Sequence, residues 1–140
     1  MIEQLKLATL VPLLPVITLL LGLTAMNAAA FVPEDLARLK SENKCPGCDL
    51  RGADLRGLKL DGANLEGANL MAANLEGASL EHAVLEDASC EKTNLRNAKL
   101  HAATMDHATV DGADFKGADL QDATWVDGRV CKKGSIGICK

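Results

Sequence analysis

An apolar residue recurs at every fifth position over much of this chain. From Cys48 to Asp127 the sequence divides into sixteen consecutive pentads without an insertion, and the residue two positions before each pentad centre is Ala in thirteen of them. A period of five fits neither an α-helix, with about 3.6 residues per turn, nor an uninterrupted strand, whose side chains alternate with a period of two. The repeat therefore requires a regular structure that turns once in every unit.

The pentad centres fall at every multiple of five from Leu50 to Trp125. Residues two apart in an extended segment face the same way, so the central residue and the preceding Ala share an inner face. Only Phe31, Phe115 and Trp125 are aromatic, so the interior has to be packed from Ala and Leu. We expect the core to contain the eleven central leucines, Leu50, Leu55, Leu60, Leu65, Leu70, Leu75, Leu80, Leu85, Leu95, Leu100 and Leu120.

The next inner residue lies three positions further on, so the chain has to turn between pentads. Glycine stands at this corner in seven pentads, including Gly52 and Gly112, and glycine tolerates the left-handed backbone of a tight turn. A corner of about 90° closes a square coil in four pentads. The sequence thus predicts an all-β solenoid, a quadrilateral β-helix of about four coils.

Both ends of such a solenoid need caps, because the terminal coils have no neighbour to cover them. The segment from Pro33 to Asn43 predicts one short helix, in which Leu36 and Leu39 can cover the first coil. We expect a capping helix and cysteine turn over residues 31–47, the β-helix over 48–127, and a disulfide-closed cap over 128–140.

Residues 1–30 contain the apolar run LATLVPLLPVITLLLGLTAM and end in three alanines. Ala28 and Ala30 fit the small-residue rule of signal peptidase, which predicts a cleaved signal peptide and Phe31 as the first mature residue. The alternative is a retained membrane anchor, because about twenty apolar residues can span a bilayer. Both interpretations place the rest of the chain in the periplasm or outside the cell. If the signal peptide is cleaved, we expect the mature chain to have no membrane contact.

The five cysteines fit an oxidising compartment. Two close pairs flank the repeat and predict disulfides, Cys131 with Cys139 and Cys45 with Cys48. Cys90 occupies a pentad centre and is expected to stay reduced as a small buried hydrophobic residue. A zinc site made of both pairs is disfavoured, because the pairs lie at opposite ends of the repeat.

The triplets ADL at Ala53 and Ala118 and ANL at Ala63, Ala68 and Ala73 resemble the A(D/N)LxX motif of the pentapeptide-repeat family. The match covers 80 of 140 residues and implies a right-handed quadrilateral β-helix. The stretch CPGCDLRGADL also resembles the entry segment of exported bacterial, often cyanobacterial, members. For a cyanobacterial protein, the thylakoid lumen is a further compartment to consider.

The repeat contains no G-x-S-x-G, H-E-x-x-H or phosphate-binding glycine loop. We therefore expect no enzymatic activity and no cofactor, but a structural or protein-interaction module, monomeric or homodimeric, with an unknown protein partner.

Some members of the family imitate DNA and inhibit gyrase. The pentads carry 15 acidic and 7 basic residues, a net charge of 7 − 15 = −8, which is an ordinary solvated surface. The chain also offers few aromatic residues for base stacking. DNA mimicry is disfavoured, and we expect no nucleic-acid partner.

Residues twenty apart stack along one edge of a square coil. This register aligns Asp87, His107 and Asp127, with Glu86 and Asp106 beside them. An imidazole and carboxylates suit a divalent cation such as zinc or manganese, so cation or small-ligand binding is the alternative function. The other interpretation is a row of separately solvated corner residues.

Overall fold

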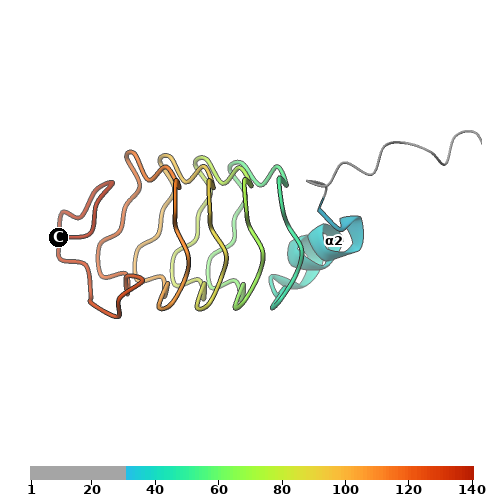
Figure 1. The fold of residues 1–140 in the computed structure, drawn as a ribbon, viewed down its shortest axis with the longest axis horizontal. Coiled ribbons are helices and arrows are strands. Elements are labelled where there is room, and N and C mark those ends of the chain that lie inside the picture. The colour runs from blue at the N-terminus through green and yellow to red at the C-terminus, as the bar shows by residue number, and fades with distance from the viewer. Residues whose placement is uncertain (1–30) are drawn as a thin grey trace, which may run out of the picture.

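The computed structural model describes residues 31–140 as a rod of stacked coils with one helix at its N-terminal end (Figure 1). The signal peptide or anchor predicted for residues 1–30 lies outside the described residues. The helix, α2, runs from Pro33–Glu42. Within residues 31–140, no helix has the length and apolar character needed to cross a membrane.

Helix α2 begins at a proline, whose fixed backbone angle suits the first helical position. It ends at Asn43, which adopts a left-handed conformation and donates its backbone N–H to the Leu39 carbonyl. Leu39 is fully buried, and Leu36 packs against the same core. Asp35 Oδ2 accepts a hydrogen bond from the backbone N–H of Asp49 at 2.9 Å. The helix thus provides a hydrogen-bond partner for a backbone group at the open edge of the first coil.

The coils are joined by parallel bridges between residues twenty apart. One series links Lys44 to Asn64, Asn64 to Val84 and Val84 to Thr104, and the other sides of the coil repeat the pattern. Each coil therefore contains four pentads. The bridges are single-residue contacts, and residues 31–140 contain no longer named strand, because every side of the coil is only one pentad long.

Two backbone N–H groups of a typical pentad donate to carbonyls of the next coil. Leu65 N donates to Val84 O, and Gly67 N to Glu86 O, both at 2.8 Å. A third bond, from Ala68 N to Leu65 O at 3.0 Å, closes the corner between successive pentads. The same three bonds recur in most pentads, so the backbone polar groups of the rod are largely paired.

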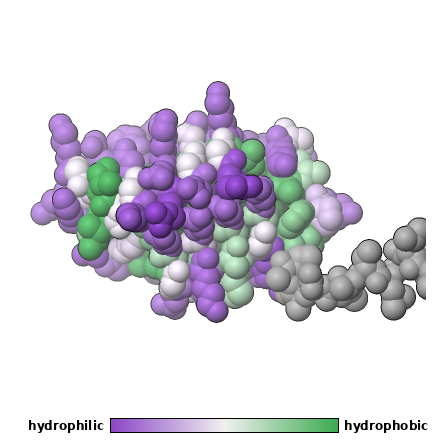
Figure 2. All heavy atoms as spheres, turned by 90° about the horizontal axis from the view of Figure 1, so that it is seen from above, coloured by the Kyte–Doolittle hydropathy of each residue, from purple (hydrophilic) through white to green (hydrophobic). Residues whose placement is uncertain are grey.

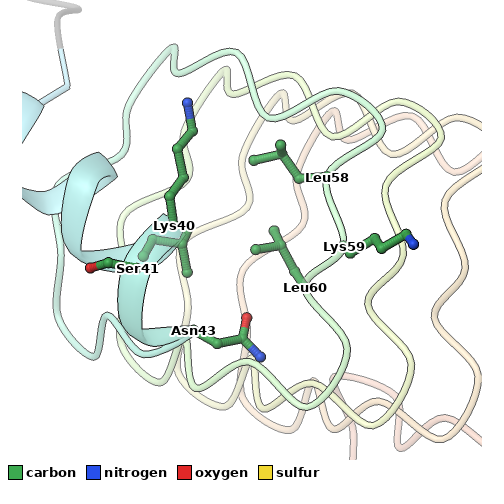
Figure 3. Close-up of a pocket in the computed structure, with 7 residues that line it drawn as sticks. Lys40, Ser41, Asn43, Leu58, Lys59 and Leu60 are labelled. Atoms are coloured by element: carbon green, nitrogen blue, oxygen red, sulfur yellow. The ribbon is translucent and has the colours of Figure 1, made fainter.

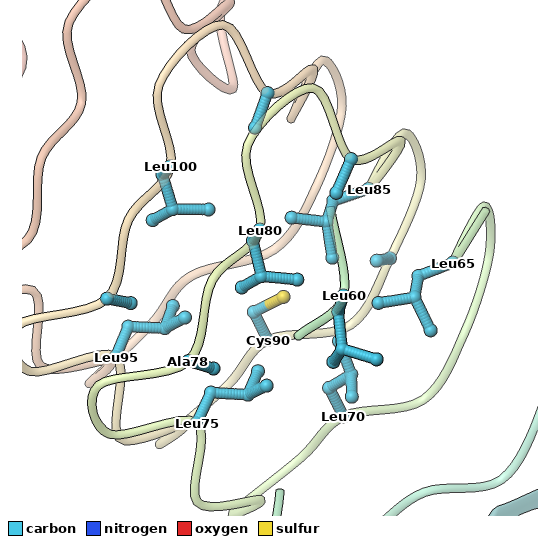
Figure 4. Close-up of a cluster of buried hydrophobic side chains, with 14 of the residues drawn as sticks. Leu60, Leu65, Leu70, Leu75, Ala78, Leu80, Leu85, Cys90, Leu95 and Leu100 are labelled. Carbon is cyan, nitrogen blue, oxygen red and sulfur yellow. The ribbon is translucent and has the colours of Figure 1, made fainter. Parts of the chain in front are cut away.

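The interior is a column of leucines and alanines (Figure 4). All eleven central leucines named above are at most 2% exposed. Cys90, Met105 and Phe115 occupy equivalent central positions and are also buried. Large and small side chains alternate along each pentad, an arrangement that allows close packing in a narrow interior.

The coil pattern begins one pentad earlier than residue 48. Cys45 N donates to Asn64 O at 2.7 Å, and Gly47 N to Glu66 O at 2.8 Å, which are the bonds of a pentad centre and its corner. The segment expected to be only a cysteine turn therefore forms part of the first coil. Cys45 occupies the position that Leu takes elsewhere, so the disulfide replaces two apolar core residues.

The C-terminal residues 128–140 reverse direction and cover the last coil. Antiparallel bridges join Thr124 to Val130 and Asp119 to Ile136. The Trp125 ring packs against the Phe115 ring, with centroids 5.1 Å apart and planes inclined by 63°. The tail thus occupies the edge on which a further coil would form.

Substituting Leu80 by Ala is expected to lower the free energy of unfolding by about 2–5 kcal/mol, because the buried side chain leaves a cavity. The exposed Glu66, changed to Ala, serves as the control and should shift stability by less than about 0.5 kcal/mol. Urea denaturation followed by circular dichroism measures both. Equal losses in the two variants would contradict the pentad register.

Candidate functional site

The corners present the outward-facing side chains of the rod. The second corner residue of a pentad has a left-handed backbone, and glycine fills this position in the early coils, as at Gly62 with φ 65°. In later coils the same position carries side chains such as His82, Asp87 and His107, with φ between 56° and 59°. Non-glycine residues are strained in this conformation. A functional side chain at such a corner is therefore accompanied by backbone strain.

The cation site expected at Asp87, His107 and Asp127 is not assembled: within residues 31–140, their donor atoms do not form a group in which all lie within 4.8 Å. His107 is 75% exposed, and its Nε2 lies 3.5 Å from Oδ2 of the adjacent Asp106. We therefore correct the sequence-based expectation: these three residues do not converge on one ion in this structure.

The physical reason lies in the last corner. Asp87 and His107 both have positive φ, but the equivalent Asp127 does not, and the left-handed residue is instead the following Gly128, with φ 77°, where the chain reverses. Asp127 consequently leaves the column and pairs with Arg129, whose Nε lies 3.2 Å from its Oδ2. The neighbouring Glu86 is exposed.

A second group of side chains meets on a different edge, which we call the histidine edge and define as His82, His101, Gln121 and Asp122. The rings of His82 and His101 lie edge to face, with centroids 6.0 Å apart and planes inclined by 79°. His101 Nδ1 is 3.9 Å from Asp122 Oδ2, and Gln121 Nε2 donates to the same oxygen at 3.2 Å.

The twenty-residue register of the sequence does not indicate the histidine edge, because its members are not twenty apart. His82 and His101 are nineteen apart, and His101 and Asp122 are twenty-one apart. The two residues of a corner form two adjacent columns, so diagonal neighbours on successive coils also approach each other. Offsets of nineteen and twenty-one residues are therefore the signal in the sequence that indicates this group.

Two disulfides lie at the ends of the rod. Cys45 is bonded to Cys48 and Cys131 to Cys139, and Cys90 is a buried free cysteine. Asp35 lies close to both sulfurs of the first pair, and this is the sole trio of potential metal ligands within 4.8 Å among residues 31–140. Because both sulfurs are oxidised, neither can act as a thiolate ligand.

The best-defined cavity lies between α2 and the first coils and has a volume of about 170 Å³ (Figure 3). Leu39, Leu58 and Leu60 form its apolar wall. Lys40 and Lys59 contribute the charged groups, but their amines point away from each other. The polar groups therefore do not converge on a common ligand position, as they do in a typical small-molecule site.

Exposed apolar side chains concentrate at the C-terminal cap, residues 128–140. Val130, Ile136 and Ile138 are 60%, 54% and 65% exposed, respectively. Figure 2 shows hydrophobic surface at this end of the rod. The same cap contains four cations and no Asp or Glu: Arg129, Lys132, Lys133 and Lys140.

The family model for pentapeptide repeats, which contains eight copies of the unit, matches residues 48–87 and 83–122, together more than half of the chain. The chain belongs to the pentapeptide-repeat family. Among solved structures, this pentapeptide-repeat protein is similar to Rfr23 from the cyanobacterium Cyanothece 51142, with 27% identity over 64% of this chain and 82% of that chain and a TM-score of 0.37.

A second pentapeptide-repeat protein, alr5209 from Nostoc Pcc 7120, is 28% identical over 62% of this chain and 78% of that chain, with a TM-score of 0.40. QnrB1, a plasmid-mediated fluoroquinolone resistance protein, is 24% identical over 57% of this chain and 39% of that chain, with a TM-score of 0.33. No curated protein matches the chain.

Cys90 of this pentapeptide-repeat protein should be chemically inert in the folded state. Burial raises the pKa of its thiol to about 12, so the reactive thiolate is scarce at neutral pH. Iodoacetamide without reductant should label Cys90 only after denaturation, and mass mapping should find the other four cysteines unlabelled. Rapid labelling of the native protein at pH 7 would contradict the buried position.

Proposed function

We propose that this protein is an exported, non-catalytic module that binds a protein partner through its C-terminal cap. The observation that carries the proposal is the combination of three exposed apolar side chains, Val130, Ile136 and Ile138, with a cap that has four cations and no Asp or Glu. Exposed apolar groups next to charge are typical of protein interaction sites.

Some of the charges on the sides of the rod are paired with each other, including those of three of the seven basic residues of the pentads. Arg56 contacts Asp54 at 2.7 Å, and Arg96 reaches across one coil to Asp114 at 3.0 Å. The Arg56 side chain holds the pKa of Asp54 down to about 2, so this pair stays ionised over the physiological pH range. Such paired, exposed charges favour solubility and offer little to a partner.

The chemistry of the cap selects the kind of partner. Among residues 31–140, no salt bridge involves Lys132, Lys133 or Lys140, whereas the pentads carry a net charge of −8. A protein segment that places carboxylates around apolar side chains would complement this cap. A second copy docking cap to cap would instead bring eight cations together, which disfavours that arrangement.

The alternative functions are less well supported. Basic side chains such as Arg51, Arg56, Lys59 and Lys99 are distributed among the acidic residues, so the pentads do not present the uniform negative surface of a DNA backbone.

The right-handed sense of the solenoid and the number of four coils remain predictions, as does export. Export would in addition separate the protein from cytoplasmic gyrase.

Site-specific photo-crosslinking in the native host tests the partner surface. A photoreactive residue at Ile138 should give one discrete adduct with another protein, while the same residue at the exposed Glu66 should not. The adduct should disappear when Lys132→Glu and Lys133→Glu reverse the charge of the cap. The purified partner, once identified by mass spectrometry, should bind Ile136→Asp at least about tenfold more weakly than the unchanged chain.

Three results would contradict the proposal: adducts to lipid, adducts between two copies of the chain, or equal adducts from Ile138 and Glu66. A lipid adduct would assign the cap to a membrane surface, and a self-adduct would assign it to oligomerisation. Either outcome replaces the protein partner proposed here.

Export is tested separately by the mass of the mature chain. Signal peptidase cleavage after Ala30 should leave Phe31 as the first residue, because Ala28 and Ala30 fit the enzyme's small-residue rule. Intact-mass spectrometry of the periplasmic fraction measures this directly. A chain that retains Met1 in the membrane fraction would establish the anchor instead, and a cytosolic pool would refute export.

A further inference from the structure

The histidine edge brings together two imidazoles and a carboxylate from three successive coils. His82 and His101 face each other with ring centroids 6.0 Å apart, and His101 Nδ1 lies 3.9 Å from Asp122 Oδ2. Imidazole nitrogen and carboxylate oxygen are ligands that suit zinc and neighbouring transition metals. His107 and Asp106 also pair an imidazole with a carboxylate, at 3.5 Å, but within residues 31–140 no second imidazole ring packs against His107.

Two distances in this group, one between ring centroids and one between donor atoms, are somewhat longer than those of a tetrahedral metal site. With metal–nitrogen distances of about 2.0–2.1 Å, two imidazoles on one tetrahedral ion have ring centroids about 5 Å apart, and two donor atoms lie about 3.3 Å apart. The observed distances, 6.0 Å between centroids and 3.9 Å between His101 Nδ1 and Asp122 Oδ2, exceed these values by less than about 1 Å.

The three donor atoms do not yet lie within 4.8 Å of one another, so the exposed His82 ring has to rotate toward the other two side chains. The backbone beneath them is fixed. His82 N donates to His101 O at 2.9 Å, and Asp122 N donates to the carbonyl of Cys131, which the C-terminal disulfide holds. Binding therefore orders side-chain torsions only, which keeps its entropic cost small.

A neighbouring amide already restrains the carboxylate. Gln121 Nε2 donates to Asp122 Oδ2 at 3.2 Å, in the way that outer groups orient the ligands of protein metal sites. His82 and Asp122 also occupy strained left-handed corners, with φ 58° and 60°, where glycine would be more stable.

From these contacts we propose that His82, His101 and Asp122 bind a divalent transition-metal ion, with Zn²⁺ as the fitting species and water completing its coordination. The site lies on a different part of the rod from the C-terminal apolar surface, and it does not depend on the proposed partner. It also differs in every residue from the group that the twenty-residue register suggested.

Isothermal titration of ZnCl₂ into the purified, metal-free protein, prepared without a histidine tag and with its disulfides intact, tests the site. One equivalent of Zn²⁺ should bind. The fold offers matched variants: His82→Gly keeps the left-handed corner, because glycine occupies that position in other pentads. His101→Gln copies Gln121, which occupies the same corner position one coil further. Each variant should weaken Zn²⁺ binding at least about tenfold.

His107→Gly is the matched control, since it removes an exposed corner histidine of the same backbone conformation from another edge. It should bind Zn²⁺ as the unchanged protein does. Cobalt substitution adds an independent readout, because Co²⁺ in a site with imidazole ligands gives visible absorption that His101→Gln should abolish.

The absence of binding heat would overturn the site. Equal affinities in His101→Gln and the unchanged protein would do so as well, as would loss of binding in His107→Gly. Circular dichroism of each variant, expected to match the unchanged protein, separates loss of a ligand from loss of the fold.

Discussion

Backbone hydrogen bonds between coils are the interaction on which the rest of this molecule depends. In each turn of the rod, bonds such as Leu75 N to Asn94 O and Asn94 N to Ala73 O tie a pentad to the next coil. A single coil cannot satisfy these groups or bury its own apolar face, so every coil is stabilised by its neighbours. The bonds also hold the coils at about the spacing of adjacent strands, which confines the interior to small and medium side chains.

This constraint separates stability from function within each pentad. The inner two positions are committed to Ala and Leu, while the corners are free to vary because their backbone is held from both sides. Gly62 and His82 show the range, since both adopt the same left-handed conformation on successive coils. Chemistry can therefore be added at a corner for the cost of local strain, without disturbing the core. The ends follow other rules, because they alone present surfaces that no neighbouring coil covers.

The period of five was sufficient to predict the square coil and the buried leucines, because both follow from side-chain alternation and one corner per unit. The start of the first coil was not predictable in the same way, since CPG at Cys45 to Gly47 does not resemble the motif although its backbone bonds match. A cap beginning at residue 128 was expected, but the position of Asp127 next to it was not, because the tail has no repeat that predicts its backbone direction. The histidine edge required the diagonal contacts between columns, which a one-dimensional register does not show.

The attachment of both caps to particular sides of the coil has a consequence for how such a chain can change its length. The N-terminal segment pairs Lys44 with Asn64 on one side of the square, and the tail pairs with Asp119 and Thr124 on two adjacent sides. Inserting one pentad would preserve the core pattern but rotate the tail by about a quarter turn relative to α2. Inserting four pentads would restore the original relation, because bridged residues are twenty apart. Length can thus vary freely in whole coils, whereas the angle between the two ends is set by the remainder when the number of pentads is divided by four.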